Sequence, residues 1–157
     1  MKKMILALAA LAFMAWGCSS DDDDDNTPTP PEPDTPAILT PGTDERPTWP
    51  AINFDLYEQN MYVEIQLQDI FLDHASDANL LSAKIGDEIR GVAKPLAIDG
   101  TWVFPLFIAA NESGGRITLS YYCERLHRIF NKTDWTHFDA NTVSTGDDEL
   151  HRPIFVK

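Results

Sequence analysis

The stretch Met61-Tyr62-Val63-Glu64-Ile65-Gln66-Leu67-Gln68 decides the fold class of this chain. Apolar side chains occupy every odd position, and polar or amphipathic side chains occupy every even position. Because successive side chains of a β-strand point to opposite faces of the sheet, this alternation predicts a strand with one dry and one wet face. A solvated second face is typical of antiparallel sheets.

Working outward from this stretch, the sequence predicts several further short strands. Gly86-Asp87 forms a tight turn between two of them, because glycine adopts positive φ without strain. Pro105 places its strand at a sheet edge or at a bulge, since proline cannot donate to a ladder. Short, regularly spaced strands without a convincing helix predict an all-β fold, an antiparallel, Ig-like β-sandwich. The predicted strands lie within 52–56, 61–68, 81–93, 101–109, 116–123 and 153–156.

Three of these segments resemble, in this order, a β-sandwich module that recurs in secreted and surface proteins of the Bacteroidota. They are residues 61–65, residues 83–93 and, after an apolar strand, residues 115–122. The most specific piece is Gly86-Asp87-Glu88-Ile89-Arg90-Gly91, where the family commonly has Cys in place of Ile89. The resemblance covers residues 60–156 and implies a fold and a compartment rather than a mechanism, because the module has no settled activity.

The N-terminal residues 1–17 have the layout of a lipoprotein signal peptide. Lys2 and Lys3 precede an uncharged apolar run of about 13 residues, which is shorter than the roughly 20 residues of a membrane-spanning helix. The alternative, a buried helix or a membrane anchor, fits poorly with two lysines before the run and five aspartates just after it. Gly17-Cys18, with Ala15 three residues before the cysteine, resembles the lipobox of bacterial lipoproteins, where Leu is commoner at the position of Ala15.

The lipobox resemblance implies that the Cys18 thiol carries a diacylglycerol and that the new amino end is acylated. Several acyl chains anchor a protein to a membrane almost permanently. The residues that follow, Ser19, Ser20, Asp21, Asp22 and Asp23, resemble the export signal of surface lipoproteins of the Bacteroidota. This resemblance implies an outer-membrane protein displayed on the cell surface. The alternative is an acidic spacer on a protein that faces the periplasm.

Residues 18–47 are predicted to form an acidic, proline-rich tether, and residues 48–157 the β-sandwich domain. Prolines recur throughout 28–36, which favours polyproline II over helix or sheet. The chain has a formal net charge of −13, and nine of its 25 carboxylates lie in residues 21–45. No basic face suited to nucleic acid is visible, so a nucleic-acid partner is not expected.

The sequence offers few residues for chemistry, and no catalytic residue, metal site or cofactor is predicted. Zinc sites need three or four ligands, and His127, His137 and Asp139 have only His151 as a further candidate nearby; no Gly-x-Ser-x-Gly motif is present. With Cys18 lipidated, Cys123 has no partner for a disulfide and is expected to be a small buried side chain. Asp87 and Glu88 are expected to point to opposite faces, with Arg90 clasping a carboxylate.

Trp49 and Trp135 are the tryptophans most suited to binding a ligand by stacking, because both lie in polar or proline-rich surroundings. Together these features predict a non-enzymatic, lipid-anchored binding module for a glycan or a protein. One alternative is a structural or accessory subunit of an outer-membrane assembly. A more remote alternative is a small hydrolase.

Overall fold

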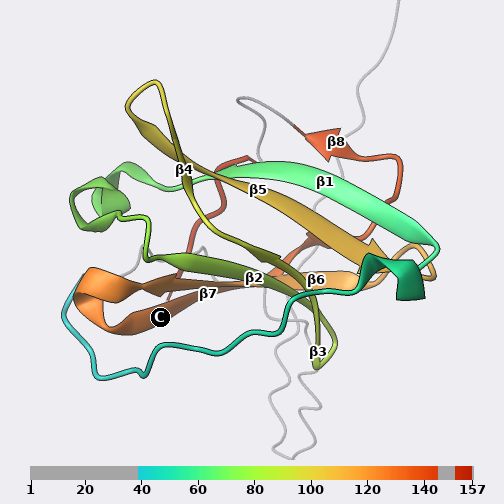
Figure 1. Ribbon diagram of the computed structural model, residues 1–157, viewed down its shortest axis with the longest axis horizontal. Coiled ribbons are helices and arrows are strands. Elements are labelled where there is room, and N and C mark those ends of the chain that lie inside the picture. The colour runs from blue at the N-terminus through green and yellow to red at the C-terminus, as the bar shows by residue number, and fades with distance from the viewer. Residues whose placement is uncertain (1–38, 145–150, 157) are drawn as a thin grey trace, which may run out of the picture. The chain divides into compact units, whose positions relative to one another are not determined.

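A computed structural model gives the structure of residues 39–144 and 151–156 (Figure 1). Cys18, Ser19, Ser20, Asp21–Asp23 and most of the predicted tether lie outside these residues. Those predictions remain predictions.

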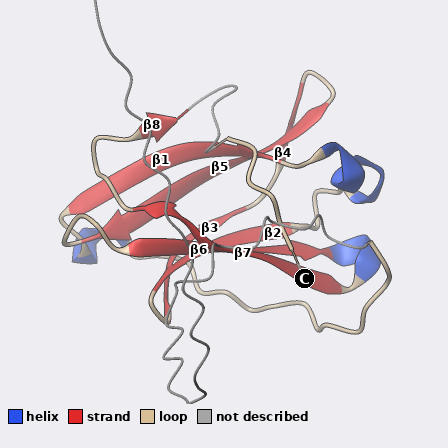
Figure 2. Cartoon of the chain, turned by 180° about the vertical axis from the view of Figure 1, so that it is seen from behind, coloured by secondary structure: helices blue, strands red, loops and turns tan. Residues whose placement is uncertain are grey.

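The described residues form two four-stranded sheets that pack face to face, which confirms the predicted all-β sandwich. Sheet A has the strand order β4-β5-β1-β8 and sheet B has the order β3-β2-β6-β7. All pairs are antiparallel except β1 with β8. The helical segments described are short 3₁₀-helices, drawn in blue in Figure 2: η1 (Phe54–Leu56), η2 (Asp69–His74) and η3 (Glu124–Leu126). The strands are β1 (Gln59–Gln66), β2 (Leu80–Ile85), β3 (Glu88–Ala93), β4 (Leu96–Ile98), β5 (Thr101–Ala110), β6 (Arg116–Cys123), β7 (Arg128–His137) and β8 (Val143–Ser144).

The alternation in β1 orients sheet A as the sequence predicts. Met61, Val63 and Ile65 are fully buried between the sheets, whereas the side chains between them face outward and are partly exposed. The Gly86-Asp87 turn also forms as predicted, between β2 and β3, with Gly86 at a φ of 61°. Both features arise from local sequence, which is why they could be predicted without knowledge of the tertiary fold.

Tyr121 of β6 lies at the centre of the core and joins both sheets. Its ring centroid is 5.9 Å from that of Phe104 in sheet A, 5.2 Å from that of Phe71 in η2 and 5.7 Å from that of Phe155 near the C-terminus. Burial, followed by the neighbouring Cys123, raises the pKa of Tyr121 far above its usual value, so the hydroxyl stays protonated. That hydroxyl accepts a hydrogen bond of 2.7 Å from the amide of the fully buried Asn79.

Several predicted elements differ from the structure. The predicted strand 52–56 is wrong, because the Asn53 side chain accepts from the Asp55 amide and starts the turn η1 instead. β4, β7 and β8 were not predicted, and the predicted strand 153–156 forms only one isolated bridge, between Val156 and Asn131. Pro105 lies in β5, which has a neighbouring strand on each side, so its predicted place in an edge strand is wrong. The proline is tolerated because β4 pairs only with Thr101–Val103, so no described strand is paired with Pro105 on the β4 side of β5.

The chain passes from sheet B to sheet A between β3 and β4, and Gly91 lies just before this crossing. A Cβ on Gly91 would be 2.5 Å from the Phe107 carbonyl oxygen and 3.1 Å from Leu106 Cδ1. Glycine is therefore required here for a close approach of β3 to β5 rather than for a positive φ. The contact closes this side of the sandwich and fixes Phe107 relative to β3.

Replacing Gly91 by alanine tests this close approach. The added carbon would force β3 away from β5, so we expect Gly91→Ala to lower the free energy of unfolding by about 1–3 kcal/mol, measured by urea denaturation. Gly100→Ala is the control, because its added carbon would meet no atom within 4 Å and only its φ of 82° makes alanine strained. Gly100→Ala should lower the free energy of unfolding by about 1 kcal/mol and leave Phe107 unperturbed. A Gly91→Ala protein as stable as the wild type would contradict the packing of β3 on β5.

Candidate ligand-binding site

Residues 42–57, here called the strap, cross the outer face of sheet B before the chain enters β1. The strap begins at the turn between β6 and β7, where the amide of Gly42 donates to the Leu126 carbonyl at 2.7 Å. The amide of Asp44 donates to the His127 carbonyl at 2.8 Å, and the Asp44 carboxylate accepts from the Ile129 amide at 2.8 Å. The predicted boundary between tether and domain, at residues 47 and 48, therefore lies inside a segment that is already docked.

Arg46 adds a further contact at this end of the strap. Its guanidinium donates to the Glu124 carboxylate at 2.7 Å and lies 6.0 Å from the centre of the Tyr122 ring. Both partners of the ion pair are more than a third exposed, so the pair contributes little to stability. Its effect is to hold the guanidinium over the outer face of β6.

The far end of the strap is held by β3. The Tyr57 ring lies 4.7 Å from the guanidinium carbon of Arg90, and Arg90 donates to the Glu88 carboxylate at 2.8 Å. The clasp between an arginine and a carboxylate that the sequence predicted near the Gly86-Asp87 turn is thus present, with Glu88 as its carboxylate. The strap is therefore attached at both ends and spans β2 and β3 in between.

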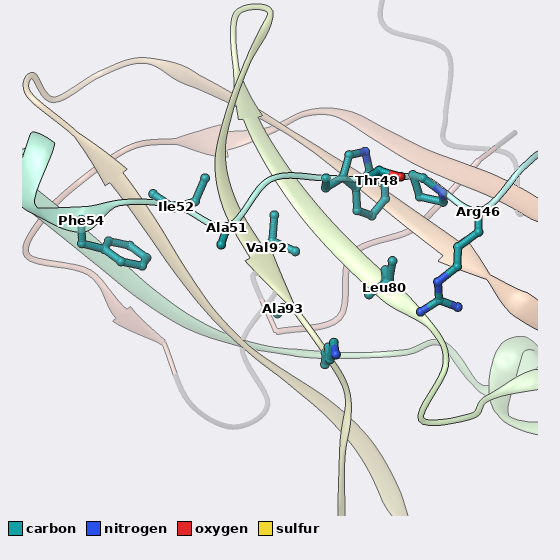
Figure 3. A pocket seen from close by; sticks show the side chains of 11 residues that line it. Arg46, Thr48, Ala51, Ile52, Phe54, Leu80, Val92 and Ala93 are labelled. Atoms are coloured by element: carbon teal, nitrogen blue, oxygen red, sulfur yellow. The ribbon is translucent and has the colours of Figure 1, made fainter.

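A groove of about 580 Å³ lies between the strap and these two strands (Figure 3). Leu80 of β2 and Val92 of β3 come from the sheet, and Arg46 and Phe54 lie at opposite ends in the view of Figure 3. Most lining side chains are apolar, and the two cationic ones are Arg46 and Lys94. The full lining comprises Arg46, Pro47, Thr48, Trp49, Ala51, Ile52, Phe54, Leu80, Val92, Ala93 and Lys94.

The groove continues into a set of aromatic rings on the outer side of sheet A, here called the aromatic cluster: Phe54 of η1, Tyr62 of β1 and Phe107 of β5. Phe54 meets Phe107 edge-on with centroids 6.3 Å apart, and Tyr62 lies opposite Phe107 in the β1–β5 pair with centroids 4.6 Å apart. Phe107 is half exposed. Phe54 belongs to both features, so groove and cluster form one continuous surface.

The hydroxyl of Tyr62 donates to the Glu64 carboxylate at 2.8 Å. Partial burial, followed by this hydrogen bond, raises the pKa of Tyr62 above its usual value, so the hydroxyl is protonated at neutral pH. The cluster thus presents ring faces and edges together with a carboxylate, which suits stacking and packing.

The two predicted tryptophans do not share a site. Trp49 is half-buried and lines the groove, as a ligand-binding role requires. Trp135 lies in β7, packs against the core and does not line the groove. Only Trp49 of the two is therefore placed to contact a ligand in the groove.

Other residues weighed from the sequence remain apart. His127 is exposed at the end of η3, His137 is exposed at the end of β7, and the Asp139 carboxylate accepts from the Asn141 amide in a local turn. Across residues 39–144 and 151–156, no three His, Cys, Asp or Glu side chains are grouped closely enough to hold a metal ion. Cys123 is fully buried, as predicted, with its sulfur 3.6 Å from the His74 carbonyl.

Sequence reasoning missed Phe54 and Phe107 as site residues. Phe107 lies in the run Trp102–Ala109, where nearly every residue is apolar, so no alternation reveals which side chain faces outward. The register that pairs Tyr62 with Phe107 shows it, because β1 alternates clearly. Comparison of the chain with protein-family models, with curated proteins and with solved structures found no match.

Removing the Asp44 carboxylate should release the start of the strap. We expect Asp44→Ala to speed hydrogen exchange of the Ile129 amide by on the order of tenfold, as measured by NMR, because one hydrogen bond of about 1 kcal/mol is lost. Asp44→Asn retains an oxygen acceptor and should keep most of the protection. If Ile129 exchanges equally slowly in Asp44→Ala, the strap is not held by this carboxylate.

Proposed function

We propose that this chain is a lipid-anchored, surface-displayed binding module without enzymatic activity, and that its ligand is a glycan or a protein. The observation that carries the proposal is the continuous surface formed by the groove and the aromatic cluster. Ligand sites are concave, mostly apolar and equipped with a few polar groups that orient the ligand. The groove has this character, with Arg46 and Lys94 as its charged groups.

The anchoring half of the proposal comes from the sequence. Cys18 would carry the lipid, and Ser19 to Asp23 would direct the protein to the outer leaflet. In the parts of the chain that the structure describes, no helix is long and apolar enough to span a bilayer. A proline-rich tether before the strap would hold the groove away from the membrane surface.

A second function, as an accessory subunit of an outer-membrane assembly, is favoured by a different observation. The outer face of sheet A exposes apolar side chains beyond the aromatic cluster, including Leu96 and Ile98 of β4 and Val143 of β8, which is 72% exposed. Contiguous exposed apolar residues mark protein contact surfaces. A permanent partner would cover this face rather than occupy the groove.

Surface display and anchoring are tested together on intact cells. Externally added protease should degrade the protein without opening the envelope, and Cys18→Ser should release it from the membrane fraction, since the acyl chains supply the anchor. Immunoblots of cells, membranes and medium measure both outcomes. A wild-type protein that resists protease until the envelope is opened would contradict surface display.

The two binding modes are separated by photo-crosslinking on the same cells. A photoreactive phenylalanine analogue replaces Thr48 in the groove, Val143 on the outer face of sheet A, or the exposed Thr133 of β7 as a control. A binding module predicts adducts from position 48 that exceed those from position 133. A single stoichiometric protein adduct from position 143, with none from position 48, would replace the proposed function by the accessory one.

A further inference from the structure

The side chains that line the groove restrict the chemistry of its ligand. Aliphatic groups dominate, and Ile52, Leu80 and Val92 offer no hydrogen bonds to a sugar hydroxyl. Leaving hydroxyl groups without partners against such a surface is costly. Apolar side chains of a peptide, by contrast, gain from burial there at about 25 cal/mol per Å².

The charged side chains of the groove add a second restriction on the chemistry of the ligand. Lys94 forms no ion pair with any residue that the structure describes, and its side chain is exposed. Arg46 uses one nitrogen on Glu124, which leaves further guanidinium donors. Because Arg46 is already paired with Glu124, Lys94 is the cation of the groove whose charge no ion pair among the described residues offsets, and this charge favours an anionic group on the ligand.

The backbone of the strap gives a third restriction on the chemistry of the ligand. Residues 47–52 form no backbone hydrogen bond with the other described residues, whereas Gly42 and Asp44 at the start of the strap donate to the turn between β6 and β7. Extended backbone with free amides and carbonyls can pair with an extended peptide, as in strand addition. Pro47 and Pro50 cannot donate, so only part of this backbone can take part.

We propose that the groove binds an extended peptide segment of a partner protein that carries both apolar and acidic side chains on one side. This inference rests on the proposed binding function and names the ligand class of the same site. Apolar side chains would pack on Leu80, Val92 and Phe54, and the acidic ones would meet Lys94 and Arg46. An extended peptide turns every second side chain toward the sheet, so the apolar and acidic side chains that contact the groove are two residues apart.

Synthetic peptide arrays and a glycan array test the proposal with the mature chain carrying Cys18→Ser as the soluble probe. The peptides carry Leu or Phe and Glu at every second position, with Ser between them; one control set has Lys in place of Glu and another has Ser in place of the apolar residues. We expect only the first set to bind, with affinity that falls as salt rises. Lys94→Glu should weaken binding about tenfold or more, whereas Lys94→Arg should retain it.

Lys84→Glu is the matched control, because Lys84 lies on the same sheet, does not line the groove and undergoes the same charge change. It should bind the peptides as the wild type does. Binding of glycans but not peptides, or equal loss in Lys94→Glu and Lys84→Glu, would overturn the peptide proposal. In the first case the binding function would stand, since the groove would still hold a ligand; crosslinking from position 48 then reports independently on that function.

Discussion

The contact between Gly91 and the Phe107 carbonyl oxygen is the constraint on which both the sandwich and its surface depend. The backbone of β3 approaches β5 so closely that a side chain at position 91 would meet the carbonyl at 2.5 Å. The residue after Gly91, Val92, lines the groove, and Phe107 is the most exposed ring of the aromatic cluster. The close approach of β3 to β5 therefore fixes the groove relative to the aromatic cluster.

The core and the strap differ in how strongly they are held. Tyr121 packs among aromatic rings from both sheets and is bonded to a buried amide, so removing any member would leave a cavity or an unpaired polar group. The strap depends instead on a few exposed hydrogen bonds, one exposed ion pair and a cation–π contact, each contributing about 1 kcal/mol or less. One wall of the groove is thus a rigid sheet, and the other is the more weakly attached strap. A ligand that binds only when the strap is docked would stabilise the docked strap.

The sequence revealed those parts of the fold that arise from local pattern. Residues 61–67 alternate, and Gly86 supplies a turn, so β1 and the β2–β3 hairpin were predictable. β7 was not, because Asp134 has a φ of 48° and the β6–β7 pairing shifts register between Ile117 and Leu119, which breaks the alternation. Of the site, Trp49 was foreseen, but the groove depends on Leu80 and Val92, which only the docking of the strap places beside it. The requirement for glycine at position 91 is a tertiary contact that no local pattern contains.

Proton contacts around Gly91, measured by NMR, show directly whether β3 packs on β5. We expect strong nuclear Overhauser effects from the Gly91 α-protons to Leu106 and Ile108, together with effects between the Phe54 and Phe107 rings. These would show that β3 lies directly on β5 and that the groove meets the aromatic cluster at Phe54. Absence of effects between Gly91 and both β5 residues, in a folded protein, would contradict the close approach and the surface built on it.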